Sequence, residues 1–103
     1  MKATTGIVET KGFVTAIGAI DEMLKSANVE FIGYKKKLGN GLVVIVIAGD
    51  VGAVNVAIKA GRIAGNAIGN VVTTHIIPKI DSETIRAFDF NNKELDKIAK
   101  VFA

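Results

Sequence analysis

Residue types that could carry out chemistry are few in this chain of 103 residues. His75 is its single histidine and it has no cysteine, so neither an imidazole pair nor a thiolate is available for a metal site or a nucleophile. Asp21 and Glu22 are sequence neighbours in an expected helix and do not face each other as an acid/base pair would. Gly49-x-x-Gly52 lacks both the dinucleotide-binding glycine spacing and the lysine of a phosphate-binding loop. We therefore predict no catalytic residue, no metal site and no cofactor.

The clearest local signal is the segment Gly39-Asn40-Gly41, which lies between a lysine run at 35–37 and an apolar run at 42–48. Glycine adopts positive φ without steric cost and asparagine tolerates it, so this segment predicts the tip of a β-hairpin beside positive charge. From local sequence alone an ordinary hairpin is the favoured interpretation. The lysine run is either a solvated strand end or an electropositive surface that enriches anions.

Composition restricts the class of protein. Half of the residues are apolar, which suits one globular domain whose core needs no disulfide. The net charge of +3 is modest and aromatic residues are few, so nucleic acid is not an expected partner. The N-terminus lacks an apolar signal segment, and the run 42–48 is far shorter than the roughly 20 residues that span a bilayer. We expect a cytoplasmic protein without a membrane partner.

Hydrophobic patterning predicts a strand–helix–strand–strand–helix–strand order. The expected strands cover 5–10, 29–34, 42–48 and 71–77, and the expected helices cover 13–26 and 51–65. This order is the split βαβ, ferredoxin-like arrangement of the α/β (α+β) class, with a four-stranded antiparallel sheet and helices on one face. We expect a domain over 1–80 and a C-terminal helical extension over 81–103, with short helices at 82–90 and 92–102.

Three details of the helices follow from the same patterns. The apolar stripe of the first helix is predicted from helical spacing to be Phe13, Ile17, Ile20 and Leu24. Asp50 is expected to cap the N-terminus of the second helix. Small residues of the second helix are expected to allow close packing against its neighbours; they are Ala53, Ala57, Ala60, Gly61 and Ala64.

Six segments in this order and spacing resemble the hexamer-forming shell proteins of bacterial microcompartments. The resemblance covers Thr5 to about Lys79 and rests on the joint register of the segments. They are Gly6-Ile7-Val8-Glu9-Thr10-Lys11-Gly12, Lys25-Ser26-Ala27-Asn28-Val29, Gly33-Tyr34, Gly39-Asn40-Gly41, Gly49-Asp50-Val51-Gly52-Ala53-Val54 and His75-Ile76-Ile77-Pro78. It implies a structural, non-enzymatic protein whose flat hexamers tile into the facets of a polyhedral organelle in the cytoplasm.

The resemblance also implies which residues act. Gly39, Asn40 and Gly41 match the loop that lines the central pore for small metabolites, with Lys37 and Leu38 at its approach. Asn40 stands where many relatives carry serine.

The hexamer–hexamer edge is implied by three other positions. Lys25 matches the edge lysine, and Asn28 is the asparagine of the same motif. Lys79 stands where many relatives place an arginine, whose planar guanidinium makes contacts that lysine does not.

The implied partners are other copies of the chain, first as a homohexamer and then as sheets, other shell proteins, encapsulated enzymes through their targeting peptides, and small metabolites. Two alternatives remain open at the level of the sequence. A ferredoxin-like regulatory domain that binds a small ligand predicts a dimer or trimer stabilised by its effector. Binding of single-stranded RNA on the sheet predicts a salt-dependent affinity.

Overall fold

The computed structural model describes residues 3–37 and 40–80, and the side chains of 4–37 and 40–78. The expected C-terminal extension over 81–103 and its two short helices lie outside the described residues. The described elements follow one another as predicted. They are β1 (Ala3–Lys11), α1 (Phe13–Ser26), β2 (Glu30–Lys36), β3 (Leu42–Gly49), α2 (Val51–Ile68) and β4 (Asn70–Ile80).

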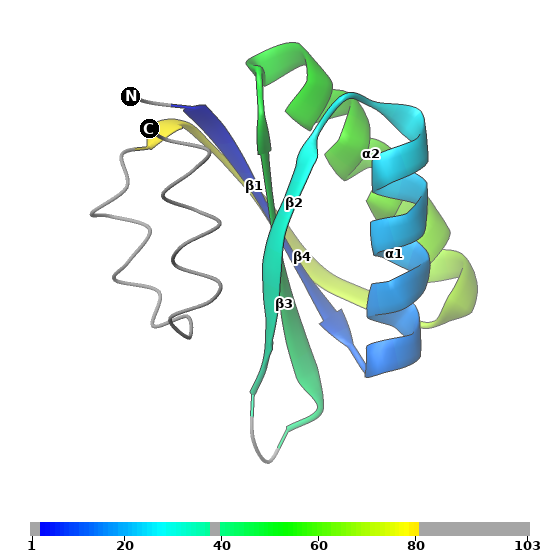
Figure 1. Ribbon diagram of the computed structural model, residues 1–103. Coiled ribbons are helices and arrows are strands. Elements are labelled where there is room, and N and C mark those ends of the chain that lie inside the picture. The colour runs from blue at the N-terminus through cyan, green and yellow to red at the C-terminus, as the bar shows by residue number, and fades with distance from the viewer. Residues whose placement is uncertain (1–2, 38–39, 81–103) are drawn as a thin grey trace.

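The four strands form one antiparallel sheet in the order β2-β3-β1-β4. Both helices lie on the same face of this sheet (Figure 1). Strand order and helix placement confirm the predicted ferredoxin-like arrangement. The central strands β1 and β3 pair over their whole length, from Thr4 opposite Gly49 to Lys11 opposite Leu42.

This register defines two opposite ends of the sheet. One end, here called the tip end, holds Lys11, Leu42 and the β2–β3 connection. The other end, called the far end, holds the start of β1, the start of β2 and the end of β4, where Ala3 pairs with Ile80. From Thr4 to Lys11 the strand rises about 23 Å at about 3.3 Å per residue.

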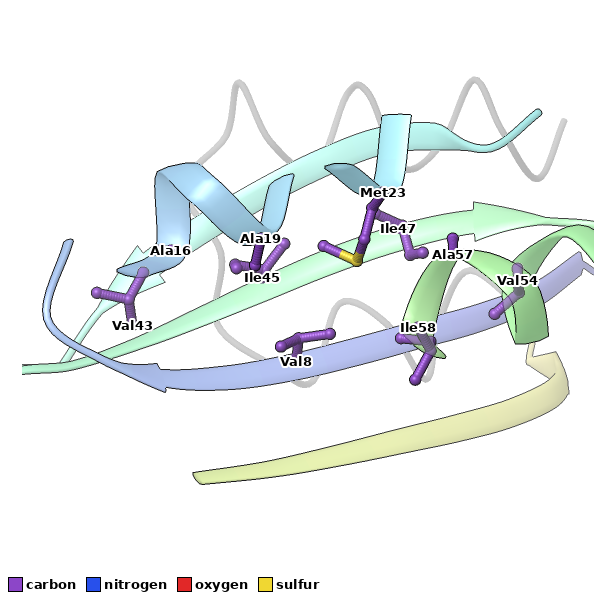
Figure 2. Packing of buried hydrophobic residues seen from close by; sticks show 10 residues of the cluster. All are labelled: Val8, Ala16, Ala19, Met23, Val43, Ile45, Ile47, Val54, Ala57 and Ile58. Atoms are coloured by element: carbon purple, nitrogen blue, oxygen red, sulfur yellow. The ribbon is translucent and has the colours of Figure 1, made fainter. Parts of the chain in front are cut away.

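The core lies between the sheet and the two helices (Figure 2). Strands β1 and β3 point alternate side chains toward the helices, as the two-residue period of a strand requires. Figure 2 shows the ten buried residues of this cluster. They are Val8, Ala16, Ala19, Met23, Val43, Ile45, Ile47, Val54, Ala57 and Ile58.

Helix α1 forms as predicted, but the predicted apolar stripe is not its core-facing side. Phe13, Ile17 and Leu24 are 38%, 49% and 43% exposed, and Ile20 is half-buried. The buried residues are instead Thr15, Ala16, Ala19 and Met23. The core-facing side of α1 is therefore built mainly from small residues, with Met23 as its one large, fully buried side chain.

Helix α2 confirms the predicted cap and close packing. The Asp50 carboxylate accepts a hydrogen bond from the Ala53 amide at 2.8 Å, which satisfies a free N–H of the first turn. Ala57 and Gly61 are buried, and a Cβ added at Gly61 would lie 2.6 Å from Met23 Cγ. The side of α2 that meets α1 therefore depends on the absence of a side chain at Gly61.

Strand β4 extends beyond its predicted end at Ile77 and includes Pro78. It reaches Ile80, and Ala3 and Thr5 of β1 pair with Ile80 and Ile77 across a register shift. Proline is tolerated here because β4 is an edge strand among the described residues, and proline is accommodated on edge strands.

Candidate functional site

The predicted hairpin tip connects β2 and β3 at the tip end of the sheet (Figure 1). Asn40 and Gly41 are both exposed, whereas Leu38 and Gly39 lie outside the described residues. Gly41 has φ +71, a left-handed conformation that favours glycine. The structure therefore confirms the hairpin. The positive φ of Gly41 also explains why glycine is favoured at this position.

Hydrogen bonds within the loop fix Asn40. Its side-chain Oδ1 accepts from the Leu42 amide at 3.1 Å, a local side-chain-to-backbone bond that closes the turn. The Lys37 amide donates to the Leu42 carbonyl oxygen at 2.8 Å and closes the loop at its base. The Asn40 side chain is thus folded back on its own loop through its oxygen.

Strand β1 holds the tip from outside the loop. The Lys11 ammonium donates to the backbone oxygen of Asn40 at 2.7 Å, and the Gly12 amide donates to the oxygen of Gly41 at 2.7 Å. Lys11 and Gly12 belong to the first of the six resembling segments, but no role at the tip was predicted for either. A contact of Lys11 and Gly12 with the tip could have been predicted from the strand order, because pairing of β1 with β3 places Lys11 opposite Leu42.

The cations beside the tip differ in their surroundings. The Lys37 ammonium forms an ion pair of 3.1 Å with Glu9, whose side chain is only 16% exposed. The Lys36 ammonium lies 4.2 Å from the centroid of the Phe13 ring, a cation–π contact, and that ring stacks at a tilt on Tyr34. The lysine run is therefore not uniformly solvated charge.

The three predicted edge residues lie at the far end of the sheet. Lys25 is in the last turn of α1 with its side chain 67% exposed, and Asn28 is exposed in the connection to β2. Lys79 is in β4 next to Ile80, and its side chain is outside the description. The structure thus places all three positions at one end of the sheet and the predicted loop at the other.

Lys25 interacts with acidic residues of its own helix, chiefly with Asp21. Its ammonium lies 2.8 Å from the Asp21 carboxylate one turn earlier. The hydrogen bond to Asp21, followed by the charge of that carboxylate, raises the pKa of Lys25 above its ordinary value. The side chain is therefore a charged, exposed group at neutral pH.

A hollow of about 360 Å³ lies on the face of the sheet opposite the helices. Four residues of its wall form one row across the sheet, with one residue from each strand. In order from β2 to β4 they are Lys35, Val44, Glu9 and Thr73. Thr73 Oγ1 lies 3.2 Å from Nε2 of the exposed His75.

Across residues 3–37 and 40–80, no group of three His, Cys, Asp or Glu side chains could hold a metal ion.

Within the same part of the chain, neither helix is long and apolar enough to cross a membrane.

Comparison with known proteins gives one consistent family. The family model of the BMC domain matches residues 4–80. The chain is 51% identical over 74 residues to the bacterial microcompartment shell protein PduA of Citrobacter freundii, covering 72% of this chain and 78% of PduA. It is 40% identical over 81 residues to the carboxysome shell protein CcmK2 of Synechocystis sp., covering 77% of this chain and 78% of CcmK2.

A solved structure shares the fold. The crystal structure of a microcompartment protein from Desulfitobacterium hafniense superposes with a TM-score of 0.68 at 31% identity, over 78% of this chain. The match spans 43% of that longer chain. Family model, relatives and structure agree, and the chain belongs to the BMC domain family of bacterial microcompartment shell proteins.

Proposed function

We propose that this shell protein forms cyclic hexamers that tile edge to edge into the shell of a cytoplasmic microcompartment. Its hairpin tips converge around a central pore that passes small polar metabolites. The protein carries out no catalysis, and its function is assembly and selective permeability. It assembles with copies of itself, with other shell proteins and, through targeting peptides, with encapsulated enzymes.

One observation carries the proposal beyond family membership. The candidate pore loop and the candidate edge positions occupy opposite ends of a sheet in which β1 rises about 23 Å. A subunit of a ring needs this separation, because one end must meet the symmetry axis while the other meets the next ring. Asn40 at the tip end and Lys25 at the far end satisfy that requirement.

The loop is suited to sieving by its size and its polar groups. Gly39 and Gly41 carry no side chain, so copies that converge on an axis leave an opening between them. Because Asn40 Oδ1 accepts from the Leu42 amide, the Nδ2 group is the donor that this side chain presents to a passing molecule. Selection would then act through pore width and hydrogen-bond complementarity.

The edge assignment is tested with Lys25→Ala. Because Lys25 also pairs with Asp21, the matched control is Asp21→Ala, which removes the same ion pair but retains the lysine. Native mass measures hexamers, and electron microscopy of concentrated protein measures sheets.

We expect Lys25→Ala to retain the hexamer and lose sheets, and Asp21→Ala to retain both. Sheets that form as readily from Lys25→Ala as from the parent protein would contradict the edge assignment. Equal loss of sheets in both variants would show that the ion pair, and not an edge contact of Lys25, is what matters.

A further inference from the structure

The tip of the β2–β3 hairpin is held at two consecutive carbonyl groups by the last residue of β1 and the residue that follows it. Lys11 Nζ donates to the oxygen of Asn40, and the Gly12 amide donates to the oxygen of Gly41, both at 2.7 Å. Lys11 also packs along the loop, since its Cε lies 3.7 Å from the position of a Cβ added at Gly41. The direction in which these two peptide groups point is therefore set by β1.

The internal bonds of the loop do not replace this contact. Asn40 Oδ1 and the Lys37 amide both bond to Leu42, at the β3 side of the turn. They fix the base of the loop and the side chain of Asn40 but leave the Asn40 carbonyl group to Lys11. Loss of the Lys11 ammonium would expose that carbonyl group and release the peptide plane between Asn40 and Gly41.

The ammonium group of Lys11 has different surroundings from those of Lys36 and Lys37, the other two lysines beside the tip. The Lys37 ammonium faces the largely buried Glu9 carboxylate, which opposes its field. The Lys36 ammonium lies over the Phe13 ring, beside α1. Lys11, in contrast, places its ammonium directly on a backbone oxygen of the tip.

We propose that Lys11 is a positioning and selectivity-determining residue of the pore loop. Its hydrogen bond holds the Asn40 carbonyl group toward β1. Its charge, repeated around the ring, favours small anions over cations of similar size. The inference rests on the proposed hexameric pore for selectivity, whereas the positioning role is a property of a single chain.

Positioning is tested by amide hydrogen exchange, resolved by residue with NMR, in Lys11→Met and Lys11→Arg. Methionine keeps the length and apolar stem of lysine without a donor, and arginine keeps donor and charge. The matched control is Lys59→Met, on the exposed side of α2. The reporters are the amides of Gly12, Lys37 and Leu42, because each donates to a group of the loop.

We expect Lys11→Met to speed exchange of these amides about three- to tenfold, as the loss of one exposed charge-assisted hydrogen bond implies. Lys11→Arg should restore slow exchange, and Lys59→Met should not change it. Unchanged exchange in Lys11→Met would overturn the positioning role, whatever the oligomeric state of the protein.

Selectivity is tested with hexamers, first verified by native mass, reconstituted in a planar bilayer under a potassium chloride gradient. We expect a reversal potential of the anion-preferring sign for the parent protein, Lys11→Arg and Lys59→Met, and a shift toward cation preference for Lys11→Met. The same reversal potential in parent and Lys11→Met would overturn the selectivity role. A protein that forms no hexamer would overturn the proposed function and with it the selectivity role, while the exchange measurement would still decide positioning.

Discussion

The contact between α1 and α2 predicts how the chain responds to a single added methyl group at Gly61. Gly61 is buried in the middle of α2, against the Met23 side chain of α1. A Cβ added at Gly61 would lie 2.6 Å from Met23 Cγ and 2.8 Å from Met23 Sδ. Both distances are well inside ordinary van der Waals contact, so the two helices or the methionine must shift.

The magnitude follows from two opposing effects. Overpacking a buried contact costs about 1–3 kcal/mol. Replacing glycine by alanine inside a helix gains up to about 1 kcal/mol. Gly52→Ala is the matched control, because its Cβ would meet only Asp50 Oδ1 at an ordinary 3.6 Å and would gain the helical term alone. We therefore expect Gly61→Ala to be less stable than Gly52→Ala by about 1–3 kcal/mol.

The assay is urea unfolding followed by circular dichroism at one fixed protein concentration, since assembly makes stability depend on concentration. A double-mutant cycle isolates the contact, because Gly61→Ala added to Met23→Ala removes the clash. In that background Gly61→Ala should be neutral or stabilising. Equal stability of Gly61→Ala and Gly52→Ala in the parent background would refute the close approach of the helices at Gly61.

Other perturbations test the remaining parts of the structure. Asp50→Ala should lower the free energy of unfolding by about 0.5–2 kcal/mol through loss of the helix cap, and Asp50→Asn should retain most of it; equal losses in urea unfolding would contradict the cap. Met23→Ala should cost about 2–5 kcal/mol because the side chain is fully buried; a loss below about 1 kcal/mol in urea unfolding would contradict that burial, because even complete collapse of the cavity leaves the lost transfer free energy. Asp21→Asn should lower the pKa of Lys25 toward its ordinary value, measured by an alkaline NMR titration of the lysine side chain. The sign follows from the raised pKa: the ion pair is complete below that pKa and is lost as pH rises through it. An unchanged Lys25 pKa in Asp21→Asn would show that Asp21 is not its cause.

Local signals predicted the elements of this fold because each is encoded by neighbouring residues. Three such features depend only on residues that are close together in the sequence. They are the turn at Gly41, the helix cap at Asp50 and the strand pattern of 42–48. The core-facing side of α1 was missed because it depends on how closely α2 approaches. That distance is set by Gly61 against Met23, residues far apart in the sequence.

The candidate site divides in the same way. The hairpin tip is a local feature, and the resemblance of six segments to one family directed attention to Asn40 and Lys25. The role of Lys11 was not visible, because its contact with Asn40 joins positions 29 residues apart. The same holds for the pair between Lys37 and Glu9, which exists only once β1 lies beside β3.

In the proposed assembly, copies of this chain form a closed ring with the hairpin tips at its axis. The most direct test is the native mass of the purified protein at moderate salt. We expect a dominant hexamer. A stable monomer, or a dimer or trimer whose thermal stability rises with a small ligand, would contradict it and favour a ligand-binding regulatory domain on the same fold.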